Sequence, residues 1–170
     1  KTICITGSNG KTTVTSMLEH ILIGMGKKAK AGGNIGLPAL ELLHQDYEFC
    51  ILELSSFQLE STKKIKSLSA VITNITPDHL DRHSTFENYV KIKHKIFKHS
   101  DNIILNREDV NIKKQNFSHK YTFGTNKPKN DKELGISSEN GKKYIFHGKN
   151  KILSEDEIKL IGSHNMLNVC

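Results

Sequence analysis

The sequence lacks any apolar run that could span a membrane. The longest candidate, around Ile21 to Met25, is short and interrupted by glycine, whereas a spanning helix needs about 18 apolar residues. An initiator methionine, a signal peptide and a tag are also missing, because Lys1 leads almost directly into an apolar strand pattern. Cys170 falls just inside a new helical pattern. We therefore expect a domain without membrane partners, cut at both ends from a longer protein.

Cysteine is scarce. The 3 cysteines, Cys4, Cys50 and Cys170, lie far apart, and none belongs to a CxxC pair or to a Cys/His cluster with zinc-ligand spacing. Cys4 and Cys50 lie within apolar strand patterns, which favours buried, reduced thiols. These observations argue against a zinc site and predict a cytoplasmic protein.

Aromatic residues are also few, at 6% of the 170 residues, although the net charge is +7. Sites for single-stranded nucleic acid combine basic residues with aromatic stacking platforms, and here the lysines are scattered without interleaved aromatic residues. We therefore expect no nucleic-acid partner. A lysine-rich composition accounts for the charge, which also favours an anionic ligand. The length and a hydrophobic content of 36% fit one globular domain.

Short apolar runs alternate with helical patterns up to about Asn116. Continuous runs such as Phe49 to Leu54 are typical of buried parallel strands, and their alternation with helices favours a parallel sheet. We predict an α/β fold with a P-loop-type, mostly parallel β-sheet flanked by helices, and a small antiparallel sheet appended from about Tyr121 to Leu160. The expected strands are Lys1 to Thr6, Lys28 to Ala31, Phe49 to Leu54, Ser69 to Ile75 and Asp101 to Leu105, and the expected helices are Lys11 to Met25, Pro38 to His44 and Thr85 to Lys98.

A glycine-rich loop, Gly7-Ser8-Asn9-Gly10-Lys11-Thr12-Thr13, joins the first predicted strand to the first predicted helix. Glycines let backbone N–H groups curl around phosphate oxygens, and the helix N-terminus adds a partial positive charge. Lys11 can reach the β- and γ-phosphates of a nucleotide, and the Thr12 hydroxyl can bind Mg²⁺. The loop is shorter than the usual P-loop, because Ile5 stands where that pattern has its first glycine. A generic Gly-Lys-Thr turn is the alternative.

The segment ITGSNGKTT resembles the ATP loop of the Mur ligase family, which includes the folylpolyglutamate synthetases and uses the same shortened loop. The resemblance spans essentially the whole chain, although about 113 to 160 carry no usable motif, and it is closest to the branch that adds D-glutamate. Further motifs that carry it are GGNIGLP at 32–38, ELSSFQLE at 53–60, NITPDHLDRH at 74–83, and Gly162-Ser163-His164-Asn165 with Asn168.

Polar residues near the ends of other predicted strands complete the candidate site. Glu53 ends a buried strand, where ligand sites of α/β sheets collect. It can be a structural ion-pair partner or, beside phosphates, a ligand of Mg²⁺. The resemblance implies that His79 binds a second Mg²⁺ and that Asp78 orients it or binds metal through water, although a solvated loop is the alternative. It also implies a set of ligand contacts: Asn34 and Ser55 on the substrate side, with a left-handed turn as the alternative for Asn34, and Asn165 and Asn168 on the adenine side.

The predicted helix from Thr85 to Lys98 places a lysine on its apolar face. At about 100° per residue, Lys93 falls on the face formed by Phe86, Tyr89, Val90, Ile96 and Phe97. Burial of an unpaired ammonium is unfavourable and lowers its pKa. Lys93 can snorkel to water. The resemblance instead implies that its amine adds CO₂ and becomes a carbamate ligand for Mg²⁺.

The resemblance implies an ATP-dependent amide ligase. The carboxylate of UDP-N-acetylmuramoyl-L-alanine takes the γ-phosphoryl group of ATP, and the amine of D-glutamate attacks the acyl phosphate. Lys11, His79 and Lys93 would be catalytic, and Thr12, Glu53, His79 and carbamylated Lys93 would hold two Mg²⁺ ions. Residues 1–170 would be the central ATP-binding domain of a monomeric enzyme, without its N-terminal UDP-binding and C-terminal amino-acid-binding domains.

Three other functions compete with this one. A sibling ligase that adds a different amino acid is disfavoured by LSSFQLE, where such siblings usually have a VSSH-like run. A P-loop kinase or GTPase is disfavoured because the sequence has no Arg-rich lid and because Asn126-Lys127-Pro128-Lys129 breaks the NKxD form. The fragment taken alone can also be only a nucleotide-binding module.

Overall fold

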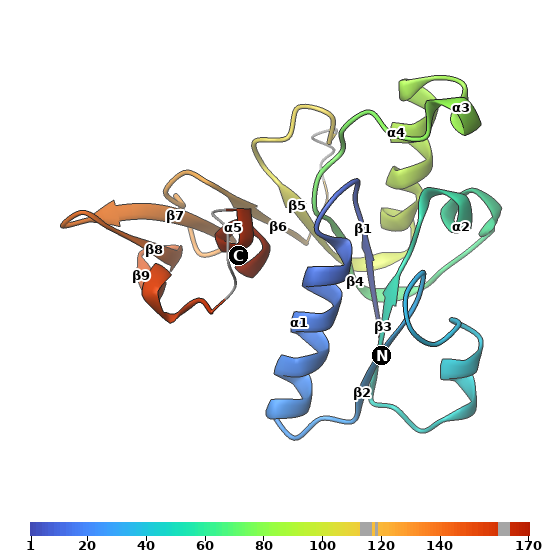
Figure 1. Cartoon of the computed structure of the whole chain (residues 1–170), viewed down its shortest axis with the longest axis horizontal. Coiled ribbons are helices and arrows are strands. Elements are labelled where there is room, and N and C mark those ends of the chain that lie inside the picture. Colours follow the sequence, from blue (N-terminus) through green and yellow to red (C-terminus); the bar gives the residue numbers. More distant parts are fainter. Residues whose placement is uncertain (113–116, 118, 160–163) are drawn as a thin grey trace.

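The computed structural model describes residues 1–112, 117, 119–159 and 164–170. Within them, nine strands form one sheet in the order β2-β3-β1-β4-β5-β6-β7-β8-β9 (Figure 1). The strands are β1 (Thr2–Thr6), β2 (Ala29–Gly33), β3 (Phe49–Glu53), β4 (Ser67–Ile72), β5 (Ser100–Asn106), β6 (Lys120–Gly124), β7 (Glu133–Glu139), β8 (Lys142–His147) and β9 (Asn150–Ser154).

Helices connect the parallel strands from β1 to β5. The α-helices are α1 (Lys11–Gly24), α2 (Ser56–Ser61), α3 (Leu80–His83), α4 (Phe86–His94) and α5 (His164–Val169). The short 3₁₀ helices are Glu41–His44, Lys95–Phe97 and Glu155–Glu157. The helix expected from Pro38 is therefore only a short 3₁₀ turn, and the one expected to Lys98 ends in a 3₁₀ turn. None of the described helices is long and apolar enough to cross a membrane.

Alternation along β1 sends its side chains to two separate cores. Cys4 packs with the first core, which is covered by α2 and α4 and includes Ile72, Ile75 and Tyr89. Ile3 and Ile5 point to the other face, where α1 packs. Because both faces of the strand are buried, its centre from Ile3 to Ile5 is apolar. Helices therefore cover both faces of this part of the sheet, as expected for a parallel α/β fold (Figure 1).

All pairings from β2 through β7 are parallel, and β7-β8 and β8-β9 are antiparallel. This confirms the predicted fold class. Two details differ from the expectation. The segment from Lys120, expected in the antiparallel part, pairs parallel to β5, and β7 was not anticipated. The antiparallel strands continue the main sheet through β7, because β7 pairs with β6 on one side and β8 on the other.

Candidate active site

The glycine-rich loop lies between β1 and α1, as predicted, and its two glycines have different roles. Gly10 adopts a left-handed conformation with φ of 80°, which favours glycine. A Cβ at Gly7 would lie 1.9 Å from Thr73 Oγ1, so the loop packs directly against the residue that follows β4. The N–H groups of Ser8 and Asn9 donate to the carbonyl and side-chain oxygens of Asn74 at 2.9 Å each. The segment after β4 therefore holds the loop in place.

Lys11, on the first turn of α1, folds back over the loop. Its Nζ donates to the carbonyl oxygens of Gly7 at 2.8 Å and Ser8 at 3.0 Å. Burial lowers the pKa of Lys11, and the carboxylates of Glu53 and Asp78 partly oppose this effect. The ammonium therefore lies at the concave loop, where it could neutralise a phosphate. Thr13 follows in the same turn.

Glu53 is the last residue of β3 and is 1% exposed. Its Oε2 accepts from the Thr12 hydroxyl at 2.9 Å, and its Oε1 accepts from Asn34 Nδ2 at 2.8 Å. Asn34 follows β2, and its backbone N–H donates to Glu53 O at 2.8 Å. A Cβ at Gly33 would lie 2.4 Å from Glu53 O, so only glycine lets β2 end so close to β3. The structure thus joins Thr12, Glu53 and Asn34.

Lys93 is 1% exposed, as expected from its place on the apolar face of α4. Its Nζ donates to Gly7 O at 2.8 Å and to Thr6 Oγ1 at 3.4 Å, and it lies 4.7 Å from the centre of the Tyr89 ring. The pKa of Lys93 is lowered from 10.5 to about 7, mainly by burial and also by the charge of Lys11, against the opposing effect of Asp78. The α4 lysine therefore reaches the phosphate loop.

The Asp78–His79 segment lies at the edge of this cluster. His79 has φ of 52°, and its side chain is 47% exposed. Its Nε2 lies 3.5 Å from Asp78 Oδ2, and its ring centre lies 5.0 Å from that of Phe57. In the described chain no hydrogen bond joins His79 to Glu53 or Lys93. Asp78 is the member of the pair whose charge influences Lys11 and Lys93.

Two further groups of predicted site residues, the N-cap Ser55 and the asparagines of α5, form hydrogen bonds within their helices. Ser55 is the N-cap of α2 and accepts from Gln58 N at 3.2 Å. Asn168 of α5 donates to Asn165 Oδ1 at 3.1 Å, and its Oδ1 would lie 2.7 Å from a Cβ at Gly10. The asparagine of α5 therefore borders the phosphate loop, whereas Gly162 and Ser163 of the same motif lie outside the described residues.

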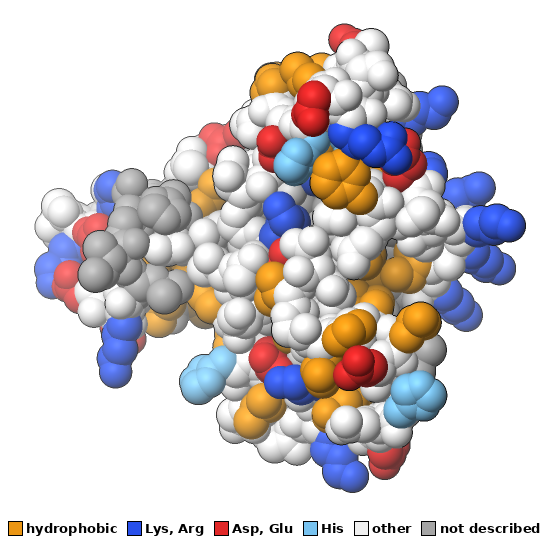
Figure 2. Space-filling model, turned by 45° about the vertical axis from the view of Figure 1, so that its right-hand side comes forward, with side chains coloured by type: hydrophobic (Ala, Val, Ile, Leu, Met, Phe, Trp, Pro, Cys, Tyr) orange, Lys and Arg blue, Asp and Glu red, His pale blue; other side chains and the backbone are white. Residues whose placement is uncertain are grey.

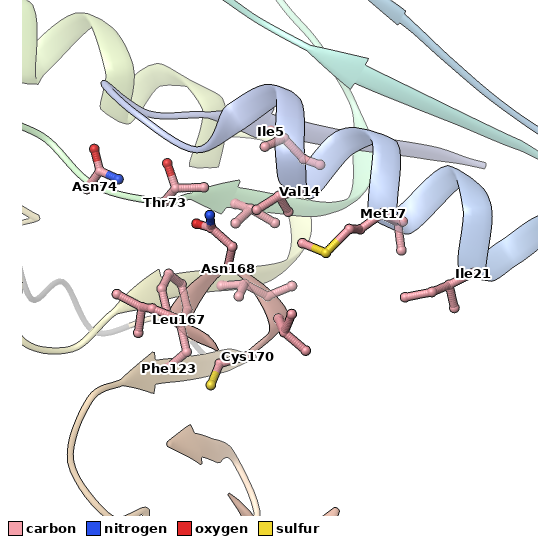
Figure 3. A pocket seen from close by; sticks show the side chains of 14 residues that line it. Ile5, Val14, Met17, Ile21, Thr73, Asn74, Phe123, Leu167, Asn168 and Cys170 are labelled. Atoms are coloured by element: carbon pink, nitrogen blue, oxygen red, sulfur yellow. The ribbon is translucent and has the colours of Figure 1, made fainter. Parts of the chain in front are cut away.

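A cavity of about 250 Å³ lies between α1 and α5, next to the phosphate loop. Asn168 lies in it between Thr73 and Val14, and Phe123 and Leu167 lie farther along its wall (Figure 3). The lining is mostly apolar, with polar groups only at the loop end, which is the usual composition of a small-molecule pocket.

Sequence reasoning gave Tyr89 no role in the site. Its hydroxyl lies 3.0 Å from Ser8 Oγ, and Ser8 Oγ in turn donates to Thr76 O at 2.9 Å. Burial raises the pKa of Tyr89. The signal was its place on the apolar face of the helix, one turn before Lys93, because such neighbours reach the same surface.

The residues present fit a magnesium–nucleotide complex. The Thr12 hydroxyl and the Glu53 carboxylate are hard oxygen donors beside a phosphate loop, and Mg²⁺ typically uses one or two carboxylates together with phosphates and water. Among the described residues no group of three or more His, Cys, Asp or Glu side chains could hold a metal alone. A second ion at His79 would therefore need further oxygens, which a carbamate on Lys93 would supply.

The fold and its glycine loop define a P-loop-type α/β domain. The chain belongs to the Mur ligase family, because the model of the Mur ligase middle domain matches residues 5–170. The UDP-N-acetylmuramoylalanine–D-glutamate ligase of Pasteurella multocida (strain Pm70) is 40% identical over 166 residues, which cover 98% of this chain and 37% of that relative. The chain thus spans well under half the length of this relative.

Solved structures agree on the fold. A UDP-N-acetylmuramoyl-L-alanyl-D-glutamate–2,6-diaminopimelate ligase gives a TM-score of 0.79 at 22% identity, covering 99% of this chain and 41% of that one. MurF ligase from Thermotoga maritima in complex with ADP gives a TM-score of 0.68 at 19% identity, covering 99% of this chain and 43% of that one.

Proposed function

We propose that the intact protein is an ATP-dependent ligase of peptidoglycan-precursor synthesis that joins D-glutamate to UDP-N-acetylmuramoyl-L-alanine. The observation that carries this proposal is the cluster at the carboxyl ends of β1 and β3, where Lys11, Thr12 and Glu53 meet beside the glycine loop. The choice of substrates rests on the 40% identity to a ligase of that name.

The cluster suits phosphoryl transfer, which depends mainly on positioning and charge neutralisation. Lys11 would leave the carbonyls of its own loop and contact the β- and γ-phosphates, while the N–H groups of the loop hold the phosphate oxygens. Thr12 and Glu53 would hold one Mg²⁺, which when bound would neutralise phosphate charge. His79 and carbamylated Lys93 would hold a second.

The substrate carboxylate would then take the γ-phosphoryl group and form an acyl phosphate. The amine of D-glutamate would attack its carbonyl carbon, form the amide bond and displace phosphate. Asn34 and Ser55 would lie on the side of the UDP-linked substrate, and Asn165 and Asn168 on the adenine side. Asn34 would also orient the Glu53 carboxylate, because it donates to it.

We further propose that residues 1–170 act as the central ATP-binding domain of a monomeric cytoplasmic enzyme. An N-terminal domain would bind the UDP group, and a C-terminal domain would bind the amino acid. The shorter length of this chain relative to the ligase from Pasteurella multocida supports this organisation. Light scattering of the intact protein would test the monomer, and a dimer would contradict it.

The decisive experiment measures ADP release by the intact protein with UDP-N-acetylmuramoyl-L-alanine and ATP. We expect turnover that depends on D-glutamate, with the amide product identified by mass spectrometry. meso-Diaminopimelate or L-lysine in place of D-glutamate should give no product, since these are the substrates of sibling ligases. Turnover with a diamino acid would reassign the protein to a sibling, and nucleotide binding without any amide product would leave only a binding module.

A further inference from the structure

His83, the last residue of α3, is a buried histidine to which the proposed reaction assigns no role. It is 1% exposed, and its Nε2 lies 2.9 Å from Ser56 Oγ. Its Nδ1 is buried and has no hydrogen-bond partner in the described part of the chain. A buried donor without a partner is unfavourable. We therefore assign the ring proton to Nε2, which donates to Ser56.

The His83 ring lies in a row of aromatic rings that leads from the metal-site segment to the phosphate loop. The Phe57 ring centre lies 5.0 Å from that of His79 and 5.4 Å from that of His83, which it stacks on at 21°. His83 lies 5.5 Å from the Tyr89 ring, whose hydroxyl contacts Ser8 at 3.0 Å. Contacts therefore connect His79 to the phosphate loop through His83.

The same residue joins three helices. Ser56 is the first residue of α2, and the Nδ2 of Asn88 on α4 donates to the backbone carbonyl of His83 at 3.1 Å. Figure 2 shows a histidine side chain beside a hydrophobic ring and charged side chains on the upper half of the face that it displays. Glu53 precedes α2, His79 is the N-cap of α3 and Lys93 is on α4, so the three helices adjoin three of the proposed metal ligands.

His79 has few anchors of its own. It has a left-handed backbone and is half exposed, and its side chain lies 3.5 Å from Asp78 and next to the Phe57 ring. Phe57 is itself 41% exposed, and its ring stacks on the buried ring of His83. A change at His83 should therefore move His79 without touching any ligand.

We propose that His83 is a positioning residue, which fixes the Asp78–His79 segment against α2 and α4 through its hydrogen bond to Ser56 and its stacking on Phe57. This inference rests on the proposed function, because it gives His79 a metal to bind. His83 itself is 1% exposed and is not one of the proposed ligands of nucleotide or metal. Removal of a partner hydrogen-bonded to a metal-binding histidine typically lowers metal affinity by about 10- to 100-fold, and His83 acts on His79 one contact further away, through Phe57.

Three variants of the intact protein separate the contributions of the two contacts. His83→Phe keeps a ring for stacking but removes the hydrogen bond to Ser56. His83→Gln keeps a polar group that can reach Ser56, and Ser56→Ala removes the partner without changing the ring. His147→Phe is the matched control, because His147 Nε2 contacts Asp131 O at 2.7 Å in the antiparallel strands, far from the site in sequence.

The primary measurement is Mn²⁺ binding to the ADP-saturated protein, with free Mn²⁺ read by electron paramagnetic resonance. We expect His83→Phe and Ser56→Ala to weaken Mn²⁺ binding about tenfold. His83→Gln should stay within about threefold of the wild type, and His147→Phe should have no effect. The Mg²⁺ concentration for half-maximal ligase activity should shift in parallel, while the KM for the UDP-linked substrate stays unchanged.

A merely structural role would lower the unfolding midpoint and the active fraction but would leave the Mn²⁺ affinity of the folded molecules unchanged. That outcome for His83→Phe would overturn the proposal. If His83→Phe does not fold, Ser56→Ala decides by the same criterion. A wild-type protein that binds Mn²⁺ and ADP but forms no amide would refute the proposed function, yet the binding measurement would still test His83.

Discussion

The parallel and antiparallel parts of the sheet differ in what they bury. Strands β1, β3 and β4 lie between two layers of helices, and the polar residues at their carboxyl ends, such as Glu53 and Thr73, are buried and hydrogen-bonded. Strands β8 and β9 each begin with exposed residues, and Lys142 of β8 pairs at the surface with Asp156 of the 3₁₀ helix after β9 at 2.7 Å. The charged side chain of Glu53 is therefore held in a fixed position where the sheet is covered on both faces, whereas Lys142 and Asp156 pair in water.

This difference predicts that substitutions at the carboxyl ends of β1, β3 and β4 lower the ligase activity strongly, whereas substitutions in the antiparallel strands change it little. The largest effect is expected for Lys11→Ala in the intact enzyme. Loss of one fixed charge-stabilising contact typically lowers kcat by about 100-fold or more. Steady-state kinetics with saturating ATP would measure it. Near-normal turnover would mean that the glycine loop does not hold the phosphates. The contrast between the parallel and antiparallel parts of the sheet would then have no functional meaning.

Lys93→Ala should have the next largest effect, a loss of about 10- to 100-fold in activity, as for other groups that set metal affinity. Lys91→Ala and Lys95→Ala provide matched controls on the exposed side of the same helical segment, and both should remain active. Short-chain carboxylic acids should partly restore Lys93→Ala by supplying oxygens, but not Lys11→Ala, whose lost group is a cation. A fully active Lys93→Ala enzyme would refute the carbamate role.

The pH dependence of stability gives a smaller effect at the same residue. The pKa of unmodified Lys93 is lowered from 10.5 to about 7, so the unfolded chain holds a proton that the folded chain lacks between these values. Stability therefore rises with pH across this window, and the full penalty of the buried charge remains below it. Lys93→Met should raise the unfolding midpoint by several degrees at about pH 6, and this gain should shrink toward about pH 10.

Thermal unfolding of the wild type and Lys93→Met at a series of pH values would measure this difference. Lys91→Met is the control, because Lys91 is exposed and removing its charge relieves no buried ammonium. A gain that is the same at every pH would show that the methionine stabilises by packing alone and that the Lys93 amine is not destabilising when charged.

The parts of the site that follow from local pattern could be predicted from the sequence. The glycine loop between strand and helix, the Glu53 strand end and the burial of Lys93 each depend on a periodicity or on a short motif. Lys93 is the clearest case, because a helical period alone places it among apolar residues and the structure buries it.

Other features depend on contacts between distant segments, which no local pattern encodes. The bond from Asn34 to Glu53 exists because β2 and β3 pair in one register, and the bond between Tyr89 and Ser8 joins residues 81 positions apart. Strand β7 was missed for a different reason. Its sequence ELGISSE has no clear alternation and contains Gly135, so the strand is defined by its neighbours in the sheet.

The smallest effect is expected in the antiparallel strands. Lys151 of β9 pairs with Glu139 of β7, and the two side chains are 40% and 41% exposed. Water and salt screen such pairs, and many contribute nothing measurable. Glu139→Gln should therefore leave kcat within about twofold and the unfolding midpoint nearly unchanged, at low and at high salt alike. Ligase kinetics and thermal unfolding at two salt concentrations would test this. A loss of activity near that of Lys93→Ala would mean that these strands contribute to the site, and the contrast between the two parts of the sheet would no longer hold.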